Sequence, residues 1–61
     1  MTANVDDIVK IQGSQNSWRV SETNGEYYTC LECSDNGLES GITTITKEAI
    51  IEIIGNINNW K

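Results

Sequence analysis

The chain has 61 residues, nine acidic side chains against four basic ones, a net charge of -5 and no histidine. A chain this short buries only about 60% of the surface that its unfolded state exposes, which leaves no interior for a large buried cofactor. Because no histidine is present to activate a serine or cysteine, a Ser-His or Cys-His nucleophile is excluded. We therefore expect a single small domain, residues 1–61, that is not an enzyme and holds no cofactor.

The charge also limits the partners. Excess negative charge repels the phosphates of nucleic acids and of anionic membranes, so binding to either is disfavoured. No run of the sequence approaches the roughly 20 apolar residues of a transmembrane helix. Residues 1–13 lack the basic and apolar regions of a signal peptide. If the chain starts at its native Met1, we expect a cytoplasmic protein.

The chain begins with a polar segment and a strand. Residues 1–4 are polar and are expected to be frayed. Residues 5–12 form the first predicted strand, with Val9 and Ile11 on one face because side chains alternate along a strand. Residues 13–17, GSQNS, are rich in turn formers and predict a loop.

The next stretch, residues 18–33, is the one around which the chain is organised. Its two strand-like arms meet at Asn24-Gly25, a pair that is the strongest short-range signal for a hairpin and that predicts a type I′ turn. In the first arm, Trp18 and Val20 share one face.

The faces of the second arm follow from its glutamates. Glu26 and Glu32 mark the side that meets solvent, so Tyr28 and Cys30 are expected to be exposed or only partly covered. The opposite face is predicted to point into the core, and its members are Tyr27, Thr29, Leu31 and Cys33.

The remaining chain predicts two more elements. Residues 34–41 are a second cluster of turn formers, and residues 42–46, ITTIT, are β-branched and predict a fourth strand. One interpretation of residues 48–54 is a short turn followed by a fifth strand, with Ile51 and Ile53 facing inward.

The same region has a second interpretation. Helical spacing relates four apolar residues, and Thr46 is available as an N-cap. These residues are Ile50, Ile54, Ile57 and Trp60. The predicted fold is thus mainly β, a five-stranded barrel over residues 5–54 with a tail or short helix at 55–61. The alternative is a four-stranded antiparallel sheet with a C-terminal helix.

The order of elements resembles a small SH3-like barrel of the KOW or Tudor type. The matching pieces are DIVKIQG, SWRVSETNGEYYTCL and GITTITKEAIIEI, which cover residues 7–54. The resemblance implies a binding module whose ligands are held by loop aromatics and strand edges. KOW modules that contact RNA are typically basic, whereas this chain is acidic.

Cys30 and Cys33 have the spacing of a C-x-x-C motif. Two thiolates supply half of a tetrahedral zinc site, so a metal site requires two chains. Residues i and i+3 of a strand point to opposite faces, about 10 Å apart along the chain, which forbids a disulfide between them. We expect these cysteines to be structural, with a thiol or dimeric metal site as the alternative.

The function we expect is that of a non-enzymatic, acidic protein-binding module that docks on a basic partner surface. A phage or mobile-element inhibitor and an accessory subunit both fit this description. The alternative is a KOW-like nucleic-acid module that binds through Lys10, Arg19 and exposed aromatics. A homodimer through an edge strand or through Trp60 is a further alternative. The predicted partner-binding residues are Glu22, Glu26, Tyr28, Glu32, Asp35, Glu39 and Trp60.

Overall fold

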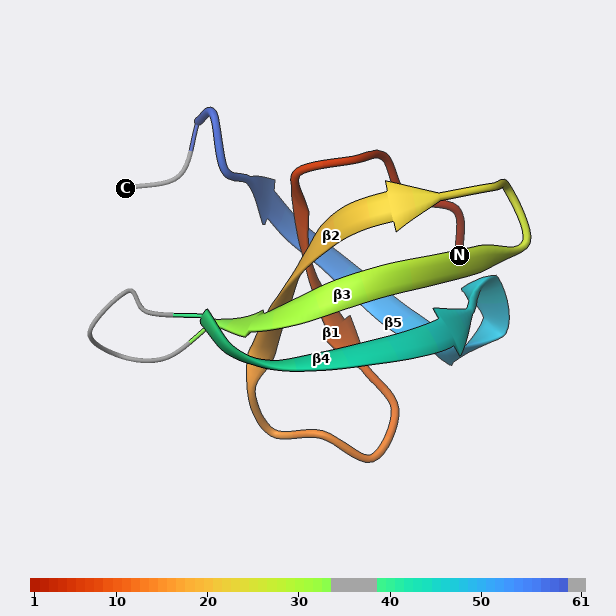
Figure 1. Ribbon diagram of the computed structural model, residues 1–61, viewed down its shortest axis with the longest axis horizontal. Helices are drawn as coiled ribbons and strands as arrows, with labels where there is room; N and C mark the ends of the chain where they lie inside the picture. The colour runs from red at the N-terminus through yellow and green to blue at the C-terminus, as the bar shows by residue number, and fades with distance from the viewer. Residues whose placement is uncertain (34–38, 60–61) are drawn as a thin grey trace.

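The computed structural model describes residues 1–33 and 39–59 and is built from five strands and one short 3-10 helix (Figure 1). The predicted mainly β fold is confirmed. The elements are β1 (Asp7–Ile11), β2 (Ser17–Thr23), β3 (Tyr27–Cys33), β4 (Glu39–Thr46), the 3-10 helix η1 (Lys47–Ala49) and β5 (Ile50–Asn56).

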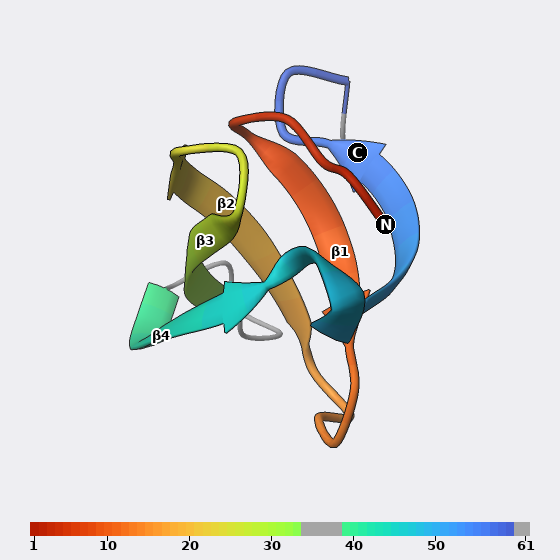
Figure 2. The same ribbon diagram turned by 90° about the vertical axis from the view of Figure 1, so that its right-hand side faces the viewer.

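All strand pairs are antiparallel and form one sheet in the order β4-β3-β2-β1-β5. The hairpin β2–β3 continues into β4, and β1 lies between β2 and β5. The sheet is strongly curved, and η1 carries the chain from β4 across to β5 (Figure 2). Within the described residues β4 and β5 are the two edges, so the sheet is not closed but is compatible with a small barrel-like fold.

The C-terminal region follows the strand interpretation, and the helical one is wrong. Gly55 pairs with Ile8 inside β5, where backbone bonds to β1 replace the bonds of a helix. The predicted facing is wrong, because Ile51 is 58% exposed while Ile50 is buried. Two register shifts between β1 and β5 interrupt the alternation on which that prediction rested.

The core lies on the concave side of the sheet. Val9 and Ile11, predicted to share a face, are both part of it, as is Val20, and Trp18 packs against it. The buried cluster consists of Ala3, Val9, Ile11, Val20, Tyr28, Cys30 and Ile50.

The N-terminal strap, residues 1–4, packs against this core instead of fraying. Ala3 is buried, and its backbone N–H donates to the phenolic oxygen of Tyr28 at 3.1 Å. The backbone nitrogen of Met1 donates to the carbonyl of Lys47 in η1 at 2.6 Å. Two long-range hydrogen bonds therefore hold a segment whose polar sequence predicted disorder.

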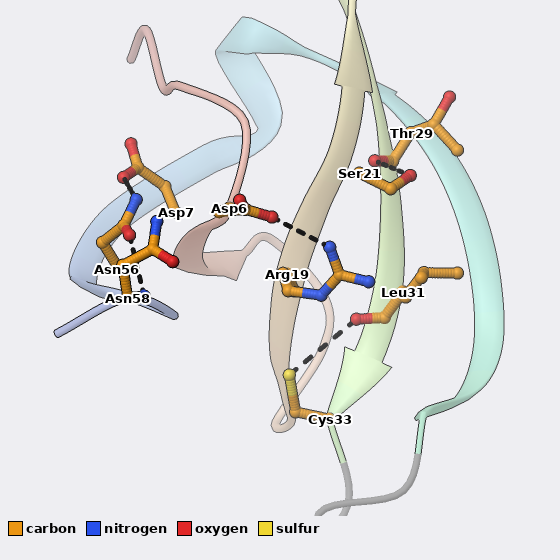
Figure 3. Close-up of polar contacts among 9 residues, drawn as sticks. All are labelled: Asp6, Asp7, Arg19, Ser21, Thr29, Leu31, Cys33, Asn56 and Asn58. Carbon is orange, nitrogen blue, oxygen red and sulfur yellow. Dashed lines mark hydrogen bonds and ion pairs between the residues drawn. The ribbon is translucent and has the colours of Figure 1, made fainter. Parts of the chain in front are cut away.

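Asp6, which follows the strap, bonds to two other segments of the chain, and Figure 3 shows its ion pair with Arg19 of β2. Its φ of 72° lies in the left-handed region, which Asp tolerates better than most residues. Its N–H donates to the carbonyl of Val20 at 2.8 Å, and its carboxylate pairs with Arg19 at 3.1 Å. Its carbonyl accepts from the N–H of Ile57 at 2.8 Å, so one residue connects the strap, β2 and the chain that follows β5.

Asp7 reinforces the same junction. One carboxylate oxygen accepts from the backbone N–H of Asn4 at 2.8 Å, and the other accepts from the side-chain amide of Asn56 at 3.0 Å (Figure 3). Asp7 is itself buried, and these bonds replace the hydrogen bonds to water that burial removes.

Candidate functional site

The loop between β2 and β3 is held by its own side chains. The side-chain carbonyl of Asn24 accepts from the N–H groups of Glu26 and Tyr27 at 3.0 and 2.9 Å. The Thr23 hydroxyl accepts from the N–H of Gly25 and donates to the carbonyl of Tyr27, both at 3.0 Å. Such local bonds to the backbone fix a turn without help from the core.

This loop differs from the predicted two-residue turn. In the described residues Asp6 is the one non-glycine with positive φ, so only Gly25 of the Asn24-Gly25 pair is left-handed, whereas a type I′ turn requires both. The last pair of the hairpin is Thr23 with Tyr28, which leaves four residues between the paired positions.

The predicted faces of β3 are reversed. Tyr28 is 1% exposed and Cys30 is 0% exposed, whereas Tyr27 is 51% exposed. The two glutamates that marked the solvent side lie at the ends of the arm, where either face meets water. Glu26 is in the loop, and Glu32 pairs with Trp18 and accepts from the side-chain amide of Asn16.

A β-bulge in β2 sets the outer face of the hairpin. Val20 pairs with Cys30, but the next partner of the ladder, Thr29, pairs with Glu22, so Ser21 is an extra residue. The Ser21 hydroxyl donates to the carbonyl of Thr29 at 3.0 Å (Figure 3). A bulge re-aims the side chains that follow it, and here it places Glu22 beside Thr29 on the outer face.

The outer face carries a hollow of about 410 Å³ near the hairpin tip, which we call the hairpin groove. Cross-strand pairing brings its walls together, because Thr29 pairs with Glu22 on one side and with Thr44 on the other. Tyr27 lies two residues before Thr29, on the same face of β3. The groove is lined by Glu22, Thr23, Asn24, Tyr27, Thr29 and Thr44.

The structure brings together only part of the predicted site. Glu22 and Glu26 are exposed near the hairpin tip, whereas Glu32 lies toward the opposite end of β3. Tyr28 was wrongly predicted as a surface contact, because it is buried and its hydroxyl accepts from the strap. The predicted Asp35 and Trp60, and the side chain of Glu39, lie outside the described residues.

Tyr27 is the residue that sequence reasoning missed. The adjacent Tyr27-Tyr28 pair always presents one ring inward and one outward, since neighbours on a strand face opposite sides. Composition cannot choose between them. The choice depends on which face of β3 meets the core. Cys30 shows this face, because it is buried and pairs with the buried Val20.

The two cysteines lie on opposite sides of β3, and Cys30 is buried. Desolvation by burial raises the pKa of the Cys30 thiol. Cys33 is half-buried, and its thiol contacts the carbonyl of Leu31 at 3.9 Å (Figure 3). In the part of the chain that the structure describes, no group of three His, Cys, Asp or Glu side chains could hold a metal ion. The burial of Cys30 keeps its thiol from any surface that a second copy could reach.

Lys10 and Arg19 are the two cations expected to bind nucleic acid in the KOW-like alternative, and both contact protein atoms. Arg19 pairs with Asp6, and the Lys10 ammonium group donates to the carbonyl of Gln15 at 3.3 Å. Among residues 1–33 and 39–59, no helix has the length and apolar character needed to span a bilayer.

Comparison of the chain with protein-family models, with curated proteins and with solved structures finds no match in any of the three. The function must therefore be argued from the residues and their geometry. The feature with the clearest chemistry is the hairpin tip, where two exposed carboxylates and one exposed ring lie beside the groove.

Proposed function

We propose that this protein is a non-enzymatic binding module that docks the tip of its β2–β3 hairpin on a basic surface of a partner protein. One observation carries the proposal. Glu22, Glu26 and the ring of Tyr27 are exposed together around the hairpin groove, and among the described residues none that lines the groove is basic. Aromatic residues are enriched in binding hot spots, and carboxylates complement a basic surface.

The strand order supports the resemblance to SH3-like barrels. The sheet runs β4-β3-β2-β1-β5, and a 3-10 turn at Lys47–Ala49 leads from β4 to β5. Barrels of the KOW and Tudor type are binding modules, so this likeness favours binding over catalysis. It names no ligand, because function depends on the site and not on the fold.

The charge of the hairpin tip predicts how binding behaves. Carboxylates on a protrusion steer a basic partner and raise the association rate, an effect that salt screens over about 8–10 Å. An inhibitor that occupies a nucleic-acid-binding surface and an accessory subunit of a complex are both roles of this class.

The test is an affinity pull-down from native lysate with the full chain, washed at low and then high salt. We expect one basic protein to be retained at low salt and released at high salt. The double variant Glu22→Lys with Glu26→Lys should lose this partner. The matched control reverses two exposed glutamates outside the β2–β3 hairpin, Glu48→Lys in η1 with Glu52→Lys in β5, and should retain it.

Two results would overturn the proposal. If both double variants lose the partner equally, binding depends on net charge and not on the hairpin. If both retain it, the contact surface is elsewhere. Retention of nuclease-sensitive nucleic acid or ribonucleoprotein by the wild-type chain would favour the KOW-like alternative instead.

A further inference from the structure

We propose that the hairpin groove seats one cationic side chain, a lysine or arginine, of the partner protein. This inference rests on the proposed function and names the chemistry of its central contact. It is argued from the groove's shape, from the charge of its lining and from the rigidity of the loop beside it.

The groove has room for a side chain of a partner. Its volume of about 410 Å³ lies within the range of roughly 300–1,000 Å³ that is typical of ligand pockets, so a single side chain would share it with water. It lies on the outer face of the sheet, where Glu22, Thr29 and Thr44 form one cross-strand row. A long, thin side chain that enters from a partner's surface fits such an open site better than a bulky cofactor.

The lining favours a cation. Glu22 contributes a carboxylate to the groove, and Tyr27 contributes an aromatic ring that is 51% exposed. A carboxylate makes charge-assisted hydrogen bonds to ammonium and guanidinium groups, and an aromatic face attracts the same groups. The other lining groups are hydroxyls and one amide. An anion would be repelled by Glu22, and an apolar ligand would remove water from the carboxylate of Glu22.

The groove is held in shape before a ligand arrives. The bulge at Ser21 sets the position of Glu22, and the bonds from Thr23 and Asn24 hold the loop that precedes Tyr27. A site built in advance loses less conformational freedom when it binds, so more of the contact energy appears as affinity.

The probe is a short peptide with one arginine flanked by glycines, together with its lysine and glutamine counterparts. Each is titrated into the full isotope-labelled chain, and backbone amide shifts are followed by NMR. We expect the arginine and lysine peptides to shift the amides of Tyr27, Thr29 and Thr44. The neutral glutamine peptide should leave them unchanged.

The variants distinguish the contributions of Glu22 and Tyr27 from an effect of net charge. Glu22→Gln and Tyr27→Ser should each weaken binding of the arginine peptide by about five-fold, as expected for losing one exposed ionic or cation–π contact. Tyr27→Phe keeps the ring and should bind as the wild type does. Glu52→Gln removes the same charge from β5, at the other edge of the sheet, and should also have no effect.

The inference is overturned if the cationic peptides shift no groove amide, or if Glu22→Gln and Glu52→Gln weaken binding equally. Its failure can be distinguished from failure of the proposed function. If the charge-reversed hairpin loses the partner but the peptides shift no groove amide, the proposed docking is supported and the cation site in the groove is not. If the groove binds the peptides but no partner is lost when the hairpin is charge-reversed, the cation site is supported and the proposed docking is not.

Discussion

The phenolic oxygen of Tyr28 accepts a hydrogen bond from the backbone N–H of Ala3 across 3.1 Å, and both residues are buried. They are 25 residues apart in the chain. Tyr28 is among the largest fully buried side chains, and its hydroxyl satisfies a donor that would otherwise lie unpaired in the core. The N-terminal strap is thereby part of the folded domain.

We expect Tyr28→Phe to lower the free energy of unfolding by about 1–3 kcal/mol, because the N–H of Ala3 loses its acceptor while the ring still fills its space. Tyr28→Ala should cost about 3–5 kcal/mol because it also leaves a cavity. Urea denaturation measures both. Tyr27→Phe, at the neighbouring exposed ring, is the control and should be nearly neutral. A neutral Tyr28→Phe would mean that water replaces the bond.

Asp6 is expected to depend on its backbone conformation. Asp6→Ala should destabilise the fold by about 1–2 kcal/mol, because alanine resists the left-handed region. The lost ion pair with Arg19 adds at most about 1 kcal/mol, since both side chains are partly exposed. Asp6→Asn tolerates the same φ and keeps an acceptor, so it should lie closer to the wild type. Equal losses in the two variants would show that φ is not the cause.

Cys30 predicts a pH dependence. Its thiol ionises near the ordinary pKa of 9.0 when the chain is unfolded, and burial raises the pKa of the folded thiol above that value. Because the unfolded state loses its proton first, this contribution to stability is complete below pH 9.0 and declines as pH rises toward the folded pKa.

The measurement is urea denaturation at several pH values on the wild type and on Cys30→Ala. The difference between their unfolding free energies should change above pH 9.0 and stay constant below it. Cys33→Ala, at the half-buried thiol, is the matched control and should retain the wild-type decline. A constant difference across the whole range would contradict the assignment.

The β4 edge gives a prediction about self-association. Ile42 is 70% exposed on this edge strand, and lysine at such a position discourages pairing with another chain. We expect Ile42→Lys to change the free energy of unfolding by no more than about 0.5 kcal/mol. Any homodimer that pairs through β4 should dissociate, as measured by sedimentation equilibrium. Unchanged association in this variant would place the contact elsewhere.

Local patterns predicted the elements because they report propensity and turn chemistry. The β-branched run at residues 42–46 lies within β4, and the short turn before the closing strand is η1. The shared faces of Val9 with Ile11 and of Trp18 with Val20 followed from alternation within a single uninterrupted stretch. A regular period was thus sufficient to identify residues that share a face.

The exposed ring and the strap depended on information that no local pattern carries. Val20 faces inward, and strict alternation from it would turn Thr23 outward. Because Thr23 pairs with Tyr28, Tyr28 would be expected to face outward too. The extra residue Ser21 reverses the direction of the side chains that follow it in β2. No residue type marks a bulge of this kind. The polar strap finds its acceptor on Tyr28, so its order depends on a long-range contact.

The bulge also bears on how this hairpin tolerates changes in length. β2 has one residue more than its pairing with β3 requires. If Ser21 is deleted, Val20 and Glu22 become neighbours, and simple alternation keeps the first inward and the second outward. The chain can therefore be shortened here without exchanging its faces. What changes is the local bend of the strand that a bulge produces, and with it the outline of the groove.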